Sequence, residues 1–366
     1  MSEKINVGIL FGGKSAEHEV SLQSAKNVFD AIDREKYNPV LIGIDKSGRW
    51  HLKDSANFLL NADDPKRISL SNDENESALL PQSKGFITHI GDIEKKERKE
   101  RIDVVFPLLH GPFGEDGTVQ GLLKLADIPF VGTSVLGSAL GMDKDVMKRL
   151  LRNARIPIGD FLALKSHEAM PSFKELVYKI GLPFFVKPAN MGSSVGVCKV
   201  RNEQEYKESV AEAFSYDRKI IIEEFIEGRE LECSVLGNED PIASTVGEII
   251  STHDFYSYQA KYIDEKGAVL EIPAKIPSDI AEKVSKLSIK TFQTLCAEGL
   301  SRVDFFLKED GSVLVNEINT MPGFTQISMY PKLWSASGIS YSDLIDRLIT
   351  LAIQRFEKES KLKTSF

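Results

Sequence analysis

The most informative segment of the chain reads Arg302-Val-Asp304-Phe-Phe-Leu-Lys-Glu-Asp-Gly-Ser-Val-Leu-Val-Asn-Glu317-Ile-Asn319. Its alternating residues predict two antiparallel strands, and the Asp-Gly pair at 310–311 is typical of a two-residue hairpin turn. In that register Asp304 lies opposite Glu317 and Arg302 lies opposite Asn319, with all four side chains on one face. Facing carboxylates repel each other unless a cation lies between them, and such oxygen ligands suit Mg²⁺ that carries nucleotide phosphates. The segment therefore predicts a metal site for ATP chemistry.

Length and composition narrow the class of protein. A chain of 366 residues is long enough for two or three domains, and 42% apolar with 27% charged residues is typical of a globular protein. The net charge of −8 argues against nucleic acid or an anionic membrane as a partner. Three widely spaced cysteines, no signal-peptide pattern and no apolar run of about 20 residues lead us to expect a cytoplasmic protein.

The pattern of strands and helices predicts an α/β protein of three domains. Near the start, a strand over 5–11, the turn Gly12-Gly13 and a helix over 15–31 predict an open parallel, Rossmann-like sheet, which binds ligands at the carboxyl ends of its strands. The polar stretch 45–101 is expected to form mostly surface hairpins and loops. Boundaries expected near Gly141 and Gly237 divide the chain into 1–141, 142–236 and 237–366. A C-terminal helix is predicted from an apolar stripe of Leu344, Leu348, Leu351 and Ile353.

Two segments of the middle region suit a nucleotide. Lys187 ends a strand and precedes a loop of small residues, Gly192-Ser193-Ser194, where backbone N–H groups approach phosphates easily. An ordinary glycine-rich hairpin explains this loop equally well. Glu223 and Glu224 end an apolar strand, which predicts a hinge for adenine, with Glu230 nearby for the ribose. Solvated acids at a strand end are the simpler alternative.

Other segments suit an amino-acid substrate. Glu17 begins the first helix, where it either stabilises the helix dipole or faces a substrate ammonium. His110 lies among three glycines after a strand, which indicates a loop against a ligand, although a lone histidine is more often structural. Lys261 in a polar loop has the charge to neutralise a carboxylate or a phosphate. The Gly323 backbone and the Ser328 hydroxyl follow the predicted metal hairpin and suit a carboxylate, and a turn followed by a helix cap is the alternative.

Together these motifs resemble the D-alanine–D-alanine ligases of the ATP-grasp superfamily over essentially the whole chain. The most specific motifs are Gly12-Gly-Lys-Ser-Ala-Glu17-His-Glu-Val-Ser, His110-Gly-Pro-Phe-Gly-Glu-Asp-Gly, the Lys187–Gly196 loop, Ala260-Lys-Tyr262 and the 302–323 segment. The resemblance implies a three-domain ATP-grasp fold and the ATP-dependent joining of two D-alanine molecules for cell-wall precursors. It also implies Mg²⁺ or Mn²⁺, with two ions, and a homodimer in the cytoplasm.

The resemblance implies a role for each site residue. Metal ligands would be Asp304, Glu317 and Asn319. Contacts to ATP would come from Lys144, Lys187, Ser193, Ser194, Glu223, Glu224, Ile226, Glu230 and Lys261. Glu17, assisted by His110, would bind the first D-alanine ammonium, and Arg302 with the Gly323 backbone would stabilise the reacting carboxyl. Lys261 and Ser328 would hold the second carboxylate or the transferred phosphate. Ser193 and Tyr262 would link to Glu17 and close the loop.

The predicted activity has three alternatives. D-Alanine–D-lactate ligation differs only in the second nucleophile, and Tyr262 in place of phenylalanine favours an amine. Another carboxylate–amine ligase of the superfamily would not be expected to carry the motifs at Glu17 and His110. A nucleotide-binding protein without catalysis would be expected to lack Arg302 or one metal acid. The base that accepts the second amine's proton stays open between the Ser193–Tyr262 pair and the acyl phosphate itself.

Overall fold

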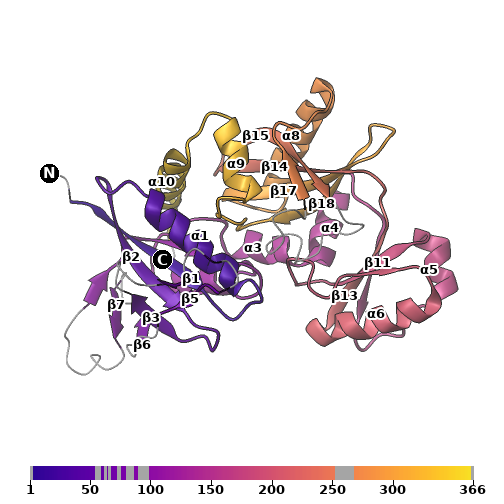
Figure 1. The fold of residues 1–366 in the computed structure, drawn as a ribbon, viewed down its shortest axis with the longest axis horizontal. Coiled ribbons are helices and arrows are strands. Elements are labelled where there is room, and N and C mark those ends of the chain that lie inside the picture. The colour runs from indigo at the N-terminus through magenta and orange to yellow at the C-terminus, as the bar shows by residue number, and fades with distance from the viewer. Residues whose placement is uncertain are drawn as a thin grey trace.

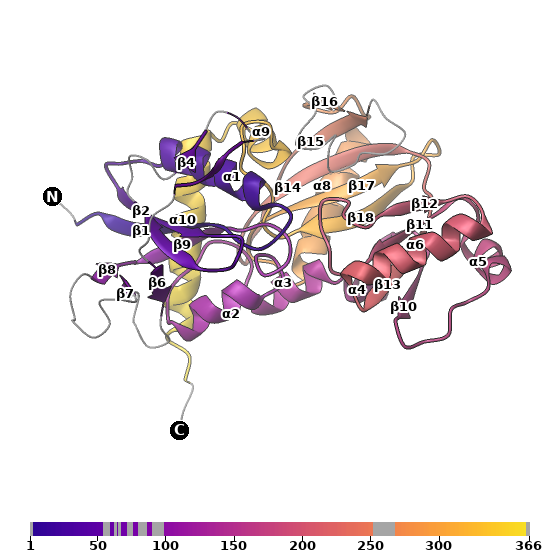
Figure 2. The ribbon, with the colours of Figure 1, turned by 60° about the horizontal axis from the view of Figure 1, so that its bottom comes forward.

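The computed structural model describes residues 3–53, 59–61, 64, 67–71, 76–79, 86–89, 99–251 and 268–363. Three larger sheets follow one another along the chain and lie side by side in space (Figure 1). The indigo and purple N-terminal sheet occupies one end, the pink middle sheet the other, and the orange sheet lies between them (Figures 1 and 2). Within the described ranges, no helix combines the length and hydrophobicity that crossing a membrane requires.

The N-terminal sheet is built on three parallel strands. Its order is β8-β7-β6-β3-β2-β1-β9, and β1 pairs in parallel with both β2 and β9. In β1 the side chains of Val7, Ile9, Leu10 and Phe11 are fully buried, as expected for a strand covered on both faces. The predicted open α/β sheet is therefore confirmed, and the 45–101 hairpins extend it with antiparallel strands. The elements are β1 (Ile5–Gly12), α1 (His18–Ala31), β2 (Tyr37–Ile44), β3 (Trp50–Lys53), β6 (Glu76–Leu79), β7 (Phe86–His89), β8 (Lys99–Arg101), β9 (Val104–Leu108) and α2 (Thr118–Leu125), with a separate pair β4 (Leu59–Leu60) and β5 (Ser69–Leu70).

The middle sheet is antiparallel, with the order β10-β13-β11-β12. Its core is apolar: Phe184, Val186, Ile220 and Ile222 are fully buried beneath α5 and α6. The strand β10 was not predicted, because it is a short edge strand whose side chains are mostly only partly buried. The elements here are α3 (Val135–Met142), α4 (Lys144–Asn153), β10 (Phe161–Lys165), α5 (Phe173–Ile180), β11 (Phe184–Pro188), β12 (Cys198–Val200), α6 (Glu203–Tyr216) and β13 (Lys219–Glu224).

The third sheet has the order β16-β15-β14-β17-β18 and contains the hairpin. Its first strand in the sequence, β14, ends at Gly237, so the sheet begins before the boundary expected there. The helix that begins after Ser328 fits the alternative interpretation of this segment as a turn followed by a helix cap. The elements are β14 (Arg229–Gly237), β15 (Ile242–Ser251), β16 (Ala268–Glu271), α8 (Ser278–Thr294), β17 (Gly299–Leu307), β18 (Val313–Asn319), α9 (Met329–Ala336) and α10 (Tyr341–Glu359).

The hairpin has the predicted register at the site but not the predicted turn. Asp304 pairs with Glu317 and Arg302 with Asn319, as expected. The turn is longer than two residues, since the Lys308 N–H donates to the Ser312 carbonyl and the strands pair beyond them as Leu307 with Val313. A bulge between Asp304 and Phe305 shifts the pairing by one residue and leaves Asn316 without a direct partner in the ladder. The longer turn and the bulge compensate, so the two acids still face each other.

The C-terminal helix α10 packs on the N-terminal sheet rather than on the hairpin sheet alone. Leu344 and Leu348 are buried in one core with Val7 and Phe106, and Leu351 and Ile353 pack against its edge. In Figure 2 the yellow helix lies along the indigo and purple strands. Arg355 on α10 donates to the carbonyls of Gly132 (2.5 Å) and Phe130 (2.9 Å), which ties the chain end to the first unit.

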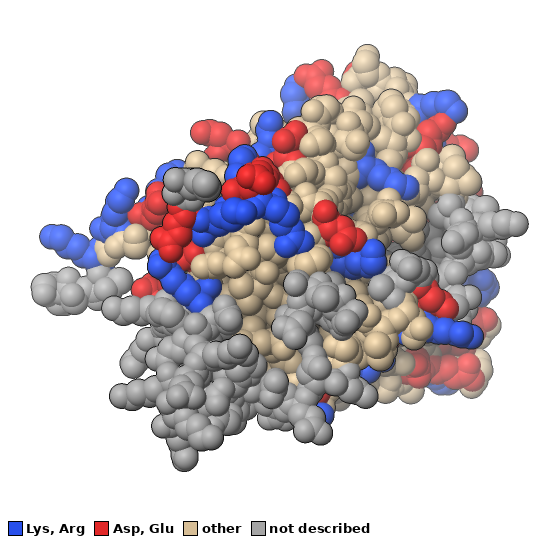
Figure 3. Space-filling view, turned by 60° about the vertical axis from the view of Figure 1, so that its left-hand side comes forward, with Lys and Arg blue, Asp and Glu red and all other residues tan. Residues whose placement is uncertain are grey.

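The surface around the N-terminal unit carries charges of both signs. On the face shown in Figure 3, Lys and Arg side chains lie among Asp and Glu side chains, so neighbouring charges partly cancel on that face.

Candidate active site

A cavity of about 300 Å³ lies between the middle sheet and the hairpin sheet. Its walls come from α4, from β11 and the loop after it, from the end of β13 and from β17 and β18. The structure brings most of the predicted nucleotide contacts to this one cavity: Lys144, Lys187, Ser193, Ser194, Glu223, Glu224, Ile226 and Glu230, with Glu317 of the predicted metal set. Lys148, Phe185, Phe225, Phe306 and Asn316 also line it and had not been predicted. A cavity with apolar and aromatic walls and a few charged groups is the usual form of a small-molecule site.

One end of the cavity is basic because three lysines meet two acids there. Glu223, with 8% of its side chain exposed, pairs with both Lys187 and Lys148, the latter at 3.2 Å. Lys144 lies 3.5 Å from Glu317. Burial would raise the pKa of Glu223, but Lys148 and Lys187 outweigh burial and lower it. Burial opposes the charge on Lys187 as well, yet Glu223 and Glu317 raise its pKa. Glu223 and Lys187 are therefore charged at neutral pH.

The acid next to Glu223 has a structural partner. The Glu224 carboxylate accepts from the backbone N–H of Asp160 at 2.8 Å, and the Ile226 side chain packs against Gly159. These contacts fix the end of β13 against the segment that leads into β10. The strand end that was expected to be the adenine hinge is thus held on both sides.

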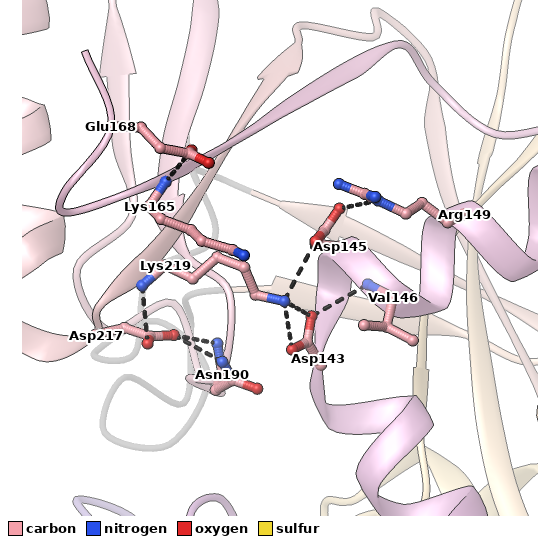
Figure 4. Close-up of polar contacts among 9 residues, drawn as sticks. All are labelled: Asp143, Asp145, Val146, Arg149, Lys165, Glu168, Asn190, Asp217 and Lys219. Carbon is pink, nitrogen blue, oxygen red and sulfur yellow. Dashed lines mark hydrogen bonds and ion pairs between the residues drawn. The ribbon is translucent and has the colours of Figure 1, made fainter. Parts of the chain in front are cut away.

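The glycine loop after β11 is fixed at its base. Asp217 Oδ2 accepts from the backbone N–H (2.8 Å) and the side-chain amide (2.9 Å) of Asn190 (Figure 4). On the other side, Lys144 Nζ donates to the Met191 carbonyl at 2.8 Å. Ser193 and Ser194 beyond this base have φ values of 51° and 60°, which residues other than glycine adopt rarely. A loop that is held firmly at its base and has an unusual backbone conformation beyond it suits a segment that closes over a ligand.

The start of α4 is tied to the same base. Lys219 Nζ donates to Asp143 (2.7 Å) and to Asp145 (3.2 Å), and the Asp143 carboxylate caps the helix at Val146 (Figure 4). Lys144 stands between these two acids in the sequence. The network therefore sets the position of Lys144 relative to the glycine loop.

The loop reaches the first helix of the chain through Ser193. Its hydroxyl donates to the carboxylate of Glu17, which lies 176 residues away in the sequence and precedes the first residue of α1. Glycines make room for this carboxylate: a Cβ on Gly111 would lie 2.5 Å from Glu17 Oε2, and one on Gly192 would lie 3.1 Å from it. The loop end of the cavity therefore meets a buried acid of the N-terminal unit.

A second acid, Glu115, lies beside Glu17 and had been assigned no role. It accepts from the backbone N–H groups of Gly111 (2.9 Å) and Met321 (3.0 Å), so it joins the loop after β9 to the segment after β18. Burial and the neighbouring Glu17 charge raise the pKa of Glu115 to about 8. Two carboxyl groups in one site hold a single proton more readily than none, because like charges repel.

His110 also joins these segments. Its Nδ1 lies 3.0 Å from the Met321 carbonyl and its Nε2 lies 3.2 Å from the Ser24 hydroxyl. Burial lowers the pKa of His110, so the ring is neutral at pH 7. Both ring nitrogens have protein partners, so His110 acts by holding the loops around Glu17.

Charged side chains line the hairpin face. Arg302 donates from Nε and Nη2 to the two oxygens of Asp304, both at 2.7 Å, and lies 2.8 Å from Glu232 on β14. Asn319 Nδ2 donates to Asp304 at 3.0 Å. Glu232 was missed from the sequence, where the alternation Glu230-Leu-Glu232 was the only available signal, and the structure shows that this acid is buried. The predicted metal ligands and Arg302 are thus brought together.

A small cavity beside this face has the donors that a hard cation prefers. It measures about 40 Å³ and is lined by Glu230, Glu232, Asp304, Asn316 and Glu317, with four apolar neighbours. Among the described residues, no group of three or more acid, histidine or cysteine side chains is already arranged to hold a metal ion. The predicted set of two acids and one amide fits Mg²⁺, which keeps part of its water shell and takes few protein ligands.

Two family models match the chain. The model for the N-terminus of D-Ala D-Ala ligases matches residues 6–133, and the model for their C-terminus matches residues 150–350. The chain belongs to the D-alanine–D-alanine ligase family. The D-alanine–D-alanine ligase of Oceanobacillus iheyensis is 52% identical over 363 residues and 99% of both chains. Ligase A of Escherichia coli is 53% identical over 365 residues, which are 99% of this chain and 100% of that protein.

Solved structures of the family agree with this fold. The D-alanine–D-alanine ligase of Coxiella burnetii superposes with a TM-score of 0.85 at 36% identity, covering 98% of this chain and 97% of that one. The Bacillus anthracis ligase complexed with ATP gives 0.72 at 29% identity, covering 97% and 99%. The ATP-grasp fold class predicted from the motifs is therefore confirmed.

The remaining predicted residues of this ligase-family chain divide into two groups. Gly323 and Ser328 are brought together, since a Cβ on Gly323 would lie 2.8 Å from the Ser328 hydroxyl oxygen. That hydroxyl accepts from the Thr325 N–H at 3.0 Å at the start of α9. Lys261 and Tyr262 lie outside the described residues, so their predicted roles stay predictions.

Proposed function

We propose that the protein joins two D-alanine molecules to D-alanyl-D-alanine, a peptidoglycan precursor, while ATP is converted to ADP and phosphate. The observation that carries this is the full-length similarity to D-alanine–D-alanine ligases, which includes both family models. The cavity supports it, because a basic pocket and an acidic hairpin meet Glu17 of the first unit through the glycine loop.

The reaction needs an activated carboxylate. Transfer of the γ-phosphoryl group of ATP to the first D-alanine carboxylate forms D-alanyl phosphate and releases ADP. The amine of the second D-alanine then attacks the carbonyl carbon, loses a proton, and the C–O bond to phosphate breaks. Water must be excluded meanwhile, since it would hydrolyse the acyl phosphate. The Ser193–Glu17 hydrogen bond supports closure of the loop over that intermediate.

The first D-alanine is proposed to lie between Glu17 and Arg302. The Glu17 carboxylate, surrounded by Gly111 and Gly192, is the anion for its ammonium. Arg302 and the Gly323 backbone N–H stabilise the negative charge that develops on the reacting carboxyl oxygen. His110 and Glu115 position these groups, because both join the Glu17 region to Met321.

ATP is proposed to occupy the larger cavity. Lys144 and Lys187 contact phosphates, the backbone near Ser193 and Ser194 covers them, and the ends of Glu223–Ile226 receive adenine. Glu224 contributes through its backbone, because its carboxylate is engaged by Asp160. Glu230 lines the cavity where a ribose would follow, and Lys261 is proposed as a further phosphate contact. Ser328, Lys261 and Tyr262 complete the site for the second D-alanine.

Asp304, Glu317 and Asn319 are proposed to hold Mg²⁺ or Mn²⁺, with two ions. When bound, the metal offsets the negative charge of the phosphates. The fit rests on the facing acids of the hairpin and on the oxygen donors around the small cavity.

The domain division, the cellular location and the oligomeric state are proposed as well. We propose three domains, with the first boundary near residue 141 and the second near 225–228, because β14 belongs to the hairpin sheet. We also propose that the protein acts in the cytoplasm as a homodimer, as expected from the resemblance.

The test is ATP-dependent phosphate release with D-alanine, with products identified by mass spectrometry. We expect dipeptide and phosphate in equal amounts from D-alanine and no product from L-alanine. A parallel sample with D-lactate separates amide from ester formation. A folded protein that binds ATP but releases no phosphate with D-alanine would refute the proposal.

A further inference from the structure

Lys148 is a buried cation that the proposed contacts do not account for. It lies on α4 one turn after Lys144, and only 3% of its side chain is exposed. Its Nζ lies 3.2 Å from Glu223 Oε1, while Lys187 pairs with Oε2 of the same carboxylate. Burying an ammonium group costs free energy unless it is paired. A second lysine on one carboxylate is therefore more than that carboxylate needs for neutrality.

The arrangement has a consequence when a phosphate arrives. Lys187, with 14% of its side chain exposed, is the more accessible of the two lysines and the proposed phosphate contact. If Lys187 were the sole partner of Glu223, its movement to a phosphate would leave a buried carboxylate unpaired, which is strongly unfavourable. Lys148 is more deeply buried and stays against Glu223. The charge on Glu223 then remains compensated whichever group Lys187 contacts.

We propose that Lys148 is a positioning residue for nucleotide binding: it stays as the counter-ion of Glu223 so that Lys187 is free to bind the phosphates. This rests on the proposed use of ATP. Lys148 acts through Glu223. The affinity for adenosine, which has no phosphate, should therefore not depend on Lys148.

The test measures equilibrium binding of ATP and of adenosine, without amino acid, to the full-length protein. For Lys148→Met we expect ATP affinity to fall about tenfold or more, the loss typical of one charge-assisted hydrogen bond. Adenosine affinity should change less than about twofold, and Lys148→Arg should keep most of the ATP affinity because it restores the charge. Arg152→Met is the matched control, since Arg152 lies on the same helix, is 53% exposed and pairs with Asp160. It should leave both affinities unchanged.

A second background separates an indirect role from a direct one. In Glu223→Gln the carboxylate charge is gone, so adding Lys148→Met should change ATP affinity less than about twofold. The same tenfold loss in that background would show that Lys148 contacts the phosphates itself and would overturn the proposal. An equal loss for adenosine and ATP, or an unchanged ATP affinity in the single variant, would overturn it too. Because binding is measured without D-alanine, a protein that binds ATP but forms no dipeptide refutes the proposed function and leaves this test standing.

Discussion

Glu115 should make the stability of this protein depend on pH in a way that a single substitution removes. Burial and Glu17 raise the pKa of Glu115 from 4.5 to about 8. Between these values the folded state holds a proton that the unfolded state has released. The free energy of unfolding therefore falls as pH rises through this range, by at most about 1.4 kcal/mol per pH unit.

Glu115→Gln removes the titrating group and keeps the shape of the side chain. Titration over the whole range has an upper bound of about 5 kcal/mol. Because Glu115 is only partly buried and its pKa depends in part on the nearby Glu17 charge, we expect about 2 kcal/mol between pH 5.5 and pH 8.5. The variant also loses one acceptor, since the Gly111 and Met321 N–H groups each bind one Glu115 oxygen. That loss costs about 1–3 kcal/mol at every pH.

The assay is urea unfolding followed by tryptophan fluorescence, because Trp334 is 1% exposed in the core that joins α9 and α10 to the N-terminal sheet. Glu115→Gln should be less stable than the native protein at pH 5.5, and the difference should shrink or reverse by pH 8.5. Glu309→Gln in the exposed hairpin turn is the control and should show a constant difference. A Glu115→Gln difference that is the same at both pH values would refute the raised pKa of Glu115.

Three further predictions concern the site. Ser193→Ala removes the hydrogen bond to Glu17, so we expect turnover to fall about 10- to 100-fold and the phosphate released per dipeptide to rise above one, measured by parallel phosphate and dipeptide assays. A ratio that stays at one would contradict a role of Ser193 in closing the loop. Arg302→Ala should lower kcat about 100- to 1,000-fold and change ATP affinity less than threefold, by steady-state kinetics and ATP titration; near-normal turnover would exclude its assignment. Asp217→Ala removes the acceptor that holds Asn190 at the base of the glycine loop, so KM for ATP should rise about fivefold or more while the melting temperature changes by only a few degrees. An unchanged KM would show that this anchor is dispensable.

The sequence predicted the elements whose residues interact locally. Period-2 alternation and two acids placed at equal distances from a turn were enough to pair Asp304 with Glu317. The prediction succeeded although the turn is longer than two residues, because the bulge at Asn316 restores the register. The family motifs likewise identified most of the charged residues that line the larger cavity, although not Lys148. Such motifs are short, and their backbone requirements are local.

The sequence did not reveal partners that only the packing brings together. Lys148 lies on the same helix as Lys144, but nothing near it in the sequence shows that it faces Glu223, 75 residues later. Glu115 becomes significant because the segment after β18 supplies Met321, 206 residues away. The pKa of a buried charged group depends on its surroundings, because burial and neighbouring charges together set it.

The sequence by itself determined the fold class, the hairpin register and the identity of most charged residues in the cavity, because strand alternation and motif spacing are local properties of the chain. The contact between Ser193 and Glu17 was implied by the resemblance and is present in the structure. Tertiary structure alone decided that α10 packs on the N-terminal sheet and that two lysines share Glu223. These contacts join residues far apart in sequence, and they form only when the sheets pack and bury the groups between them.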